Sequence, residues 1–236
     1  MAKRVVLLIP WDPNSPEHVE ELFQQRVQCG WNSNHVEKWR TAQAEGSKCI
    51  YWVVIPEDAP DRNDLIKQHL ATYPKPGIPL VDTSTSINAK PVTPSGVQFQ
   101  PVGHISLDPG NPSAKDLQLD LPASGCYWIT TFYISTVLQS QGLGGAAMAA
   151  AESMAALEPL CAKALALDTL KAEDQRREDI ANALFGGVPK VTNQEWYSRR
   201  GYQLIKTVVN HYHRELTAIL GPGHESSTVF MKRDVA

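Results

Sequence analysis

The residues best suited to chemistry in this sequence form a polar, glycine-rich turn just past mid-chain. Residues 139–145 read Gln-Ser-Gln-Gly-Leu-Gly-Gly, and the residues that follow are small and helix-forming. The start of a helix carries backbone N–H groups without intrahelical partners and the positive end of the helix dipole. Because glycine has no side chain, a phosphate can approach such a backbone closely. The turn is therefore a candidate anion site.

The elements on either side of the turn are a predicted strand and a predicted helix. Residues 128–135 are mostly β-branched or aromatic, without a breaker, which indicates a buried strand. The helix is expected to begin at Leu143 and run to about Leu157, with Pro159 closing it. Two classes of nucleotide-cofactor protein use such a strand–turn–helix unit.

The first class is the dinucleotide-binding oxidoreductases. Residues 142–147 fit their Gly-x-Gly-x-x-Gly/Ala fingerprint, and Asp168 follows on a later predicted strand. That fingerprint requires its first glycine directly at the strand end, however, and here six residues separate Ser135 from Gly142. The sequence therefore favours the second class, and an NAD(P)-binding oxidoreductase is the weaker alternative.

The second class is the GNAT family of N-acetyltransferases. Gln139-x-x-Gly142-x-Gly144 resembles that family's Gln/Arg-x-x-Gly-x-Gly/Ala signature, whose loop binds the pyrophosphate of coenzyme A. Residues 193–202 resemble the Tyr-x-x-x-Gly-Phe/Tyr helix that follows the fifth strand of the same family. The sequence of residues 196–202 is also similar to that of fungal members of the family. The two motifs occur in the family's order, so the resemblance covers nearly the whole chain.

The resemblance implies an α/β (α+β) fold with a mixed, mostly antiparallel sheet, splayed central parallel strands and flanking helices. Residues 1–236 are expected to form a single domain, with a Pro-rich insertion at about 56–96 and a charged helical insertion at about 171–190. The first insertion is either a segment folded over the acceptor site or a disordered surface excursion. The expected strands are 4–9, 49–55, 97–107, 128–135, 164–168, one containing His211 and His213, and 228–232. The expected helices are 16–29, 34–44, 64–71, 143–157, 171–178 and one beginning near 193.

The resemblance also implies roles for individual residues. Ile134 and Thr136 offer main-chain groups to the pantetheine arm of acetyl-CoA. The amides that wrap its pyrophosphate are those of Gln139, Ser140, Gln141, Gly142, Leu143, Gly144 and Gly145. Tyr197 matches the family tyrosine that protonates the departing thiolate, and packing of its ring against the sheet is the alternative role.

The general base is not defined by the resemblance. Some family members place a glutamate where Trp128 stands here, and tryptophan takes no proton. The substitutes are His104, Asp168, His211 or His213, and water-mediated deprotonation is also open. No metal site is expected, because His211 and His213 lack a nearby carboxylate or cysteine.

Composition bounds the remaining classes of function. The 236 residues carry a net charge of −3, which provides no basic surface for nucleic acid or an anionic membrane. The four cysteines are widely spaced and no run is long enough to span a membrane, so we expect a reduced, cytoplasmic protein, with the nucleus as an alternative address. The chain is thus predicted to be an acetyl-CoA-dependent N-acetyltransferase that acts on a small-molecule or peptide amine, with a homodimer left open. A non-catalytic acyl-CoA-binding module is the main alternative.

Overall fold

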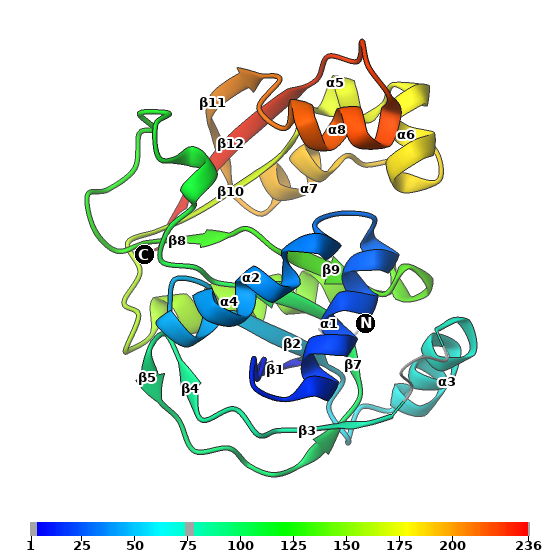
Figure 1. The fold of residues 1–236 in the computed structure, drawn as a ribbon, viewed down its shortest axis with the longest axis vertical. Coiled ribbons are helices and arrows are strands. Elements are labelled where there is room, and N and C mark those ends of the chain that lie inside the picture. Colours follow the sequence, from blue (N-terminus) through cyan, green and yellow to red (C-terminus); the bar gives the residue numbers. More distant parts are fainter. Residues whose placement is uncertain (1–3, 74–77, 236) are drawn as a thin grey trace. The chain divides into compact units, whose positions relative to one another are not determined.

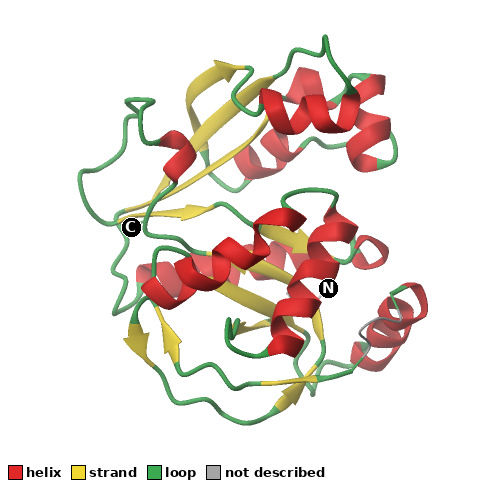
Figure 2. Ribbon diagram, viewed as in Figure 1, coloured by secondary structure: helices red, strands yellow, loops and turns green. Residues whose placement is uncertain are grey.

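The computed structural model describes residues 4–73 and 78–235 and contains two compact units (Figure 1). The first unit is made of residues 1–111 and 127–161, and the second of 112–126 and 162–236. Each unit combines helices with strands (Figure 2). The single-domain organisation stays a prediction. Within the described residues, no helix is long and apolar enough to cross a membrane.

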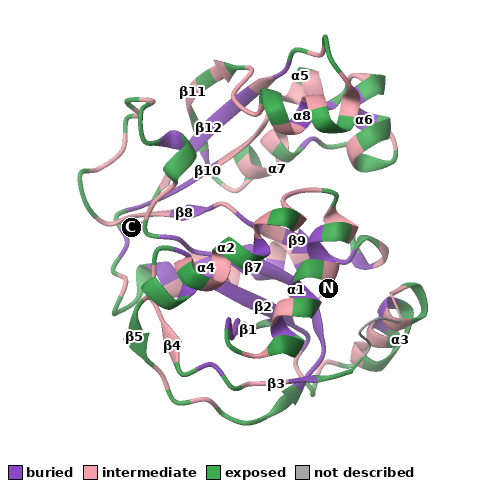
Figure 3. Cartoon of the chain, in the orientation of Figure 1, coloured by how far each residue is buried: buried purple, intermediate pink, exposed green. Residues whose placement is uncertain are grey.

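The first unit is built on a four-stranded sheet in the order β1-β2-β7-β9, with every neighbouring pair antiparallel. Its strands are β1 (Leu7–Pro10), β2 (Ile50–Val54), β7 (Pro101–Ser106) and β9 (Phe132–Ile134). Strands β2 and β7 are buried along their whole length, as Figure 3 shows. Their β-branched and aromatic residues form the centre of the core.

Helix α1 (Pro16–Cys29) begins and ends as the sequence predicts. The Ser15 side chain accepts a hydrogen bond from the His18 N–H, and Gly30 ends the helix in the left-handed conformation. The apolar side chains of Phe23 and Val27 are exposed on this helix. Polar residues fill the buried face of the helix beside Leu22: His18, Glu21, Gln25 and Arg26.

Two further helices complete the first unit's main body. Helix α2 (Val36–Glu45) follows a 3-10 turn at Ser33–His35, and Gly46 caps it. Helix α4 (Leu143–Ala156) follows the glycine-rich turn and has contacts with β1 and β9. Its alanines let it lie close to the sheet, and Ala147, Ala151 and Ala155 are fully buried.

The Pro-rich insertion contains one helix and short strand pairs. Helix α3 (Arg62–Thr72) is the short helix that the sequence predicts, and it has contacts with the 3-10 turn η3 (Thr136–Leu138). The short pairs are β3 (Leu80–Val81) with β6 (Gln98–Phe99), and β4 (Ser86–Ile87) with β5 (Lys90–Pro91).

Two predicted strands are interrupted. The strand expected at 97–107 is broken at Gln100, between β6 and β7. The one expected at 128–135 is broken at Thr130 and Thr131, between β8 (Cys126–Ile129) and β9. Apolar composition predicts both strands, but it does not predict the residue at which each strand changes from one neighbouring strand to another.

The second unit contains three neighbouring strands of one sheet, with β12 between β11 and β10. Its antiparallel centre consists of β11 (Gln203–Val209), β12 (Ser227–Asp234) and β10 (Ala164–Leu170). Its helices are α5 (Ala172–Gln175), α6 (Glu178–Phe185), α7 (Asn193–Arg199) and α8 (His213–Leu220). The expectation of a strand at His211 and His213 is wrong: β11 ends at Val209, and His213 opens α8.

A buried ion pair joins Lys48, two residues before β2, to Asp108, two residues after β7. The Lys48 ammonium lies 2.8 Å from Asp108 Oδ2, and the two side chains are only 8% and 3% exposed. Asp108 Oδ1 accepts from the Cys49 N–H at 2.8 Å, and Oδ2 also accepts from the hydroxyls of Ser106 and Thr130. Burial lowers the pKa of Lys48, and the nearby Asp108 carboxylate opposes that shift.

Removing Asp108 should therefore destabilise the protein strongly. Asp108→Ala leaves the Lys48 ammonium buried without its counter-ion, a change that costs about 3–5 kcal/mol of unfolding free energy. Urea denaturation measures the loss. The matched control is Glu37→Ala, which removes an exposed ion pair with Arg40 and should change stability by about 0.5 kcal/mol or less. Equal effects of the two variants would contradict this account.

Candidate functional site

The predicted coenzyme segment runs from the end of β9 to the first turn of α4. Ile134 ends β9 and is buried, and the next residue, Ser135, donates its N–H to the carbonyl of Val102 at 2.8 Å. The turn η3 follows at once, where Leu138 is fully buried and Thr136 is exposed. The sheet therefore fixes the position of the start of this segment, and the position of its later residues depends on other contacts.

The glycine-rich turn has the backbone conformation that its glycines allow. Gly142 is the N-cap of α4 and has φ +85°, a left-handed value that favours glycine. Ser140 is also left-handed, at φ +63°, which is uncommon for a residue with a side chain. Leu143 is fully buried and anchors the helix start in the core.

The turn presents a row of backbone donors. Among the residues that the structure describes, no protein acceptor pairs with the backbone N–H groups of residues 140–145. The Gln139 N–H differs, because it donates to the Thr136 carbonyl at 3.3 Å. Clustered N–H groups at a helix start, with no Cβ at three of the residues, suit a diphosphate.

Gln139 itself fastens the turn to the strand. Its side-chain amide donates to the Ile134 carbonyl at 3.1 Å. Since a carbonyl oxygen has two lone pairs, Ile134 can still accept a second bond. The first residue of the motif thus joins the strand end and the turn into one unit.

Residues that sequence reasoning missed surround this segment. Helix α3 makes side-chain hydrogen bonds to it through Gln68, His69 and Tyr73. The Arg4 side chain lies 3.9 Å from where a Cβ on Gly142 would be, and its guanidinium forms a two-pronged ion pair with Asp61. No local spacing pattern signals these contacts, because each joins residues more than 50 positions apart in sequence.

Tyr197 lies in the second unit, on α7. A capping box of Thr192 and Glu195 starts that helix. The Tyr197 ring packs edge-on against Trp196 and Tyr202, with centroids 5.0 and 5.9 Å away. Burial raises the pKa of the Tyr197 phenol, and the Asp168 carboxylate adds to the rise. The phenol is therefore protonated at neutral pH, as a proton donor must be.

Among the base candidates, His104 is excluded by its contacts. It is fully buried, with Nδ1 at 2.8 Å from Gln25 Oε1 and Nε2 at 3.3 Å from the Arg26 guanidinium. Nδ1 therefore donates and Nε2 accepts, which leaves no lone pair for a substrate proton. Burial, with Arg26 and Lys48 nearby, lowers the pKa of His104 well below its usual value.

The other candidates lie in the second unit. Asp168 accepts a hydrogen bond from the Tyr212 hydroxyl at 2.9 Å. His211 packs edge-on against Tyr212 and Phe230. Its Nε2 is buried and has no hydrogen-bond partner among the residues that the structure describes. His213 begins α8 and is exposed.

A carboxyl group that the sequence did not single out lies on α1. Glu21 is 5% exposed, and its Oε1 accepts from the Gln25 amide at 2.7 Å. Burial raises the pKa of Glu21 to about 7. No cation lies within 4 Å of it in the described part of the chain. A carboxylate that titrates near neutrality can act as a general base.

Comparison with known proteins identifies the fold. No family model matches the sequence, and no curated protein matches it. A putative GNAT acetyltransferase from Desulfovibrio desulfuricans is similar in structure, with TM-score 0.54, 11% identity and coverage of 98% of this chain and 100% of the other. A GNAT acetyltransferase from Elizabethkingia anophelis with acetyl-CoA bound has a TM-score of 0.50 and 11% identity, with 97% of each chain covered. The aminoglycoside 6'-N-acetyltransferase from Enterococcus faecium has a TM-score of 0.50 and 10% identity, with 98% of this chain and 97% of the other covered.

At these identities the comparison shows the fold, and the predicted fold class is confirmed. The chain has the mixed α/β fold of GNAT acetyltransferases, with antiparallel strands and flanking helices. This fold also argues against the dinucleotide-binding alternative, which needs parallel strands around its glycine turn, whereas β9 pairs antiparallel with β7.

The contact between α3 and Ser135 should make stability depend on pH. His69 is 2% exposed, and burial lowers its pKa from 6.5 to about 4. The unfolded chain therefore takes up the proton first, and stability falls as the pH drops from about 6.5 to 4. The full shift corresponds to about 3 kcal/mol.

Urea denaturation at pH 7 and pH 4.5 tests this. His69→Gln should lose less stability between the two pH values than the parent protein does. His213→Gln, at an exposed histidine, should keep the parent's pH dependence. If His69→Gln also keeps it, the histidine is not responsible.

Proposed function

We propose that this chain is an acetyl-CoA-dependent N-acetyltransferase that acylates a primary amine. The observation that carries the proposal is the row of N–H groups at residues 140–145, placed at the start of α4 within a GNAT fold. The Elizabethkingia structure, described as holding acetyl-CoA, supports the choice of co-substrate. The Gln139-x-x-Gly142-x-Gly144 spacing is the family signature for its pyrophosphate.

The residues of the turn would bind the diphosphate together. A single charge–dipole contact at a helix start contributes about 0.3–1 kcal/mol, so affinity requires several such contacts. Ile134 and Thr136 would present main-chain groups to the pantetheine arm. The Arg4 side chain lies beside Gly142, with its guanidinium paired to the Asp61 carboxylate.

Acetyl-CoA supplies the acetyl group as a thioester, which an amine can attack directly. An alkyl amine with pKa near 10.4 is mostly protonated at pH 7, and freeing it costs about 4–5 kcal/mol. The candidates for taking that proton are Asp168, His211, His213 and a water path. Glu21 is a further candidate, because it is a buried carboxyl group whose pKa is raised to about 7. Tyr197 would donate its phenolic proton to the departing sulfur.

The acceptor is proposed to be a small-molecule or peptide amine. The Enterococcus neighbour is named as acting on the 6'-amine of aminoglycosides, which supports a small-molecule acceptor. A reduced cytoplasmic setting, a homodimer and the likeness to fungal members remain predictions. A non-catalytic acyl-CoA-binding module is the alternative that Trp128 favours, because that residue is buried and takes no proton.

The first test concerns coenzyme binding. Gly142→Glu places a carboxylate where the phosphates would bind, so isothermal titration should show no binding of coenzyme A to the variant. Gly30→Glu is the matched control. Gly30 also has a positive φ, +73°, and has open space around it, so this variant carries a similar backbone strain and should bind like the parent. Parent-like affinity in Gly142→Glu would remove the site assignment.

The second test concerns the proton donor. Tyr197→Phe should lower kcat by about 10²–10⁴-fold, the usual contribution of a general acid, with little change in acetyl-CoA binding. The control is Tyr202→Phe, which keeps the ring contact with Tyr197 and is allowed by the family motif. Since burial raises the pKa of Tyr197 above its usual value of 10, the parent should lose kcat only above pH 10. Full activity in Tyr197→Phe would show that Tyr197 has only a packing role.

A parent protein that binds coenzyme A but acetylates no amine would favour the non-catalytic alternative.

A further inference from the structure

The glycine-rich turn needs support from outside itself. Its own backbone supplies two bonds before the helix begins, from Leu138 to the Ser135 carbonyl and from Gln139 to the Thr136 carbonyl. Ser140 is held in the left-handed region, which is unfavourable for a residue with a side chain. A conformation of this kind persists only when neighbouring groups determine it.

Helix α3 of the Pro-rich insertion supplies that support. His69 Nδ1 lies 2.9 Å from Ser135 Oγ, and the Tyr73 hydroxyl is bonded to Thr136 Oγ1. Gln68 Nε2 donates to the Val137 carbonyl at 2.9 Å. Three consecutive residues of the segment are thus each bonded to a side chain of the same helix.

Gln68 is the side chain that reaches furthest towards the turn. While its Nε2 donates to Val137, its Oε1 accepts from Gln141 Nε2 at 3.3 Å. Gln141 Nε2 also donates directly to the Val137 carbonyl at 3.4 Å, so Gln68, with both a donor and an acceptor, closes a triangle of hydrogen bonds with these two residues. Gln141 directly precedes Gly142, so this bridge ends at the residue before the helix cap.

The start of α3 is also tied to the turn. Asp61 is the N-cap residue of α3 and forms the two-pronged ion pair with Arg4. Arg4 in turn lies against Gly142. The start of α3 is therefore linked to the turn through Arg4, and Tyr73, just after its end, is bonded to Thr136 in η3. Buried Leu65 and His69 attach the middle of the helix to the core.

We propose that α3 is a positioning element of the coenzyme site and that Gln68 is the positioning residue through which it sets the turn. Gln68 holds Val137 and Gln141 at a fixed separation, and this aims the N–H groups of residues 140–145 at one point. The inference rests on the proposed function, because the point in question is the diphosphate of acetyl-CoA. It gives the insertion a role in coenzyme affinity and none in the acyl transfer itself.

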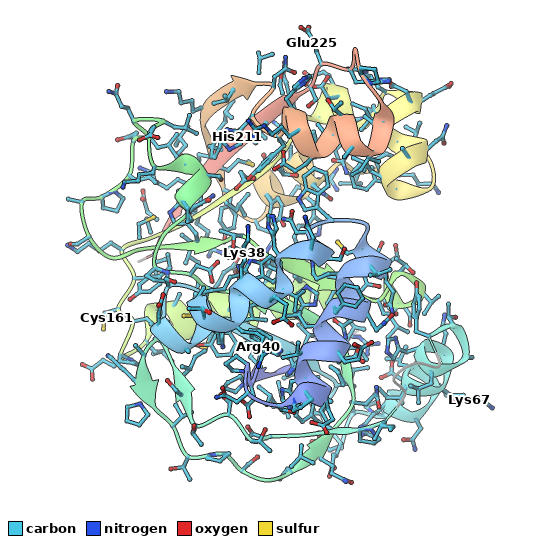
Figure 4. All side chains as sticks on the ribbon, in the orientation of Figure 1. Lys38, Arg40, Lys67, Cys161, His211 and Glu225 are labelled. Atoms are coloured by element: carbon cyan, nitrogen blue, oxygen red, sulfur yellow. The ribbon has the colours of Figure 1, made fainter. Side chains whose placement is uncertain are left out.

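The test compares two neighbouring exposed residues of α3. Gln68→Met keeps the length of the side chain and removes both hydrogen bonds. Lys67→Ala is the matched control, since Lys67 is exposed and extends away from the body of the unit (Figure 4). Gln68→Met should weaken acetyl-CoA binding about tenfold by isothermal titration and raise its KM similarly. Its kcat, the KM for the amine and the thermal midpoint should match those of Lys67→Ala.

A second donor substrate separates positioning from general damage to the fold. S-acetylpantetheine carries the thioester without the diphosphate, so its kcat/KM should be the same in Gln68→Met and in the control. Equal acetyl-CoA affinity in the two variants would overturn the inference, as would an equal loss with both donors. A parent protein that binds no coenzyme A would instead overturn the proposed function, and the inference with it.

Discussion

The buried carboxylate of Asp108 is the group on which the first unit's geometry depends. Its backbone pairs with Trp128 on β8, while its side chain binds Lys48 and the hydroxyl of Thr130. Ser106 completes the junction, because its backbone N–H donates to the Thr131 carbonyl and its hydroxyl accepts from the Thr131 N–H. These bonds hold the chain at the break between β8 and β9. The break directs residues 132–134 to β7, and from there the chain enters η3 and the glycine-rich turn.

Much of the fold was predictable because local rules govern it. Ser15 and Gly30 bound α1 by capping chemistry that operates within a few residues, and the apolar run at Ile50–Val54 forms the central strand β2. The turn at 139–145 lies where the sequence places it, at the start of α4. In each case the deciding interactions lie close together along the chain.

The rest could not be predicted, since it depends on contacts between distant residues. Sequence reasoning found α3 but not its bonds to residues 135–141, which span more than 60 positions. The buried face of α1 carries Gln25 and Arg26, because His104 on β7 donates a hydrogen bond to Gln25 and accepts one from Arg26. The break at Thr130 likewise requires Asp108 and Ser106, which precede it by more than 20 residues. The composition of a segment indicates whether it is buried, but it does not indicate which distant residue forms hydrogen bonds with its polar groups.

The position of Arg4 has a practical consequence for handling the protein. This residue precedes the first strand, yet it lies against Gly142 at the cap of α4. A purification tag fused ahead of it would enter the first unit beside the anion-binding turn. A tag placed after β12 would be attached to the second unit. Measurements of coenzyme affinity are therefore best made without a fusion directly ahead of Arg4.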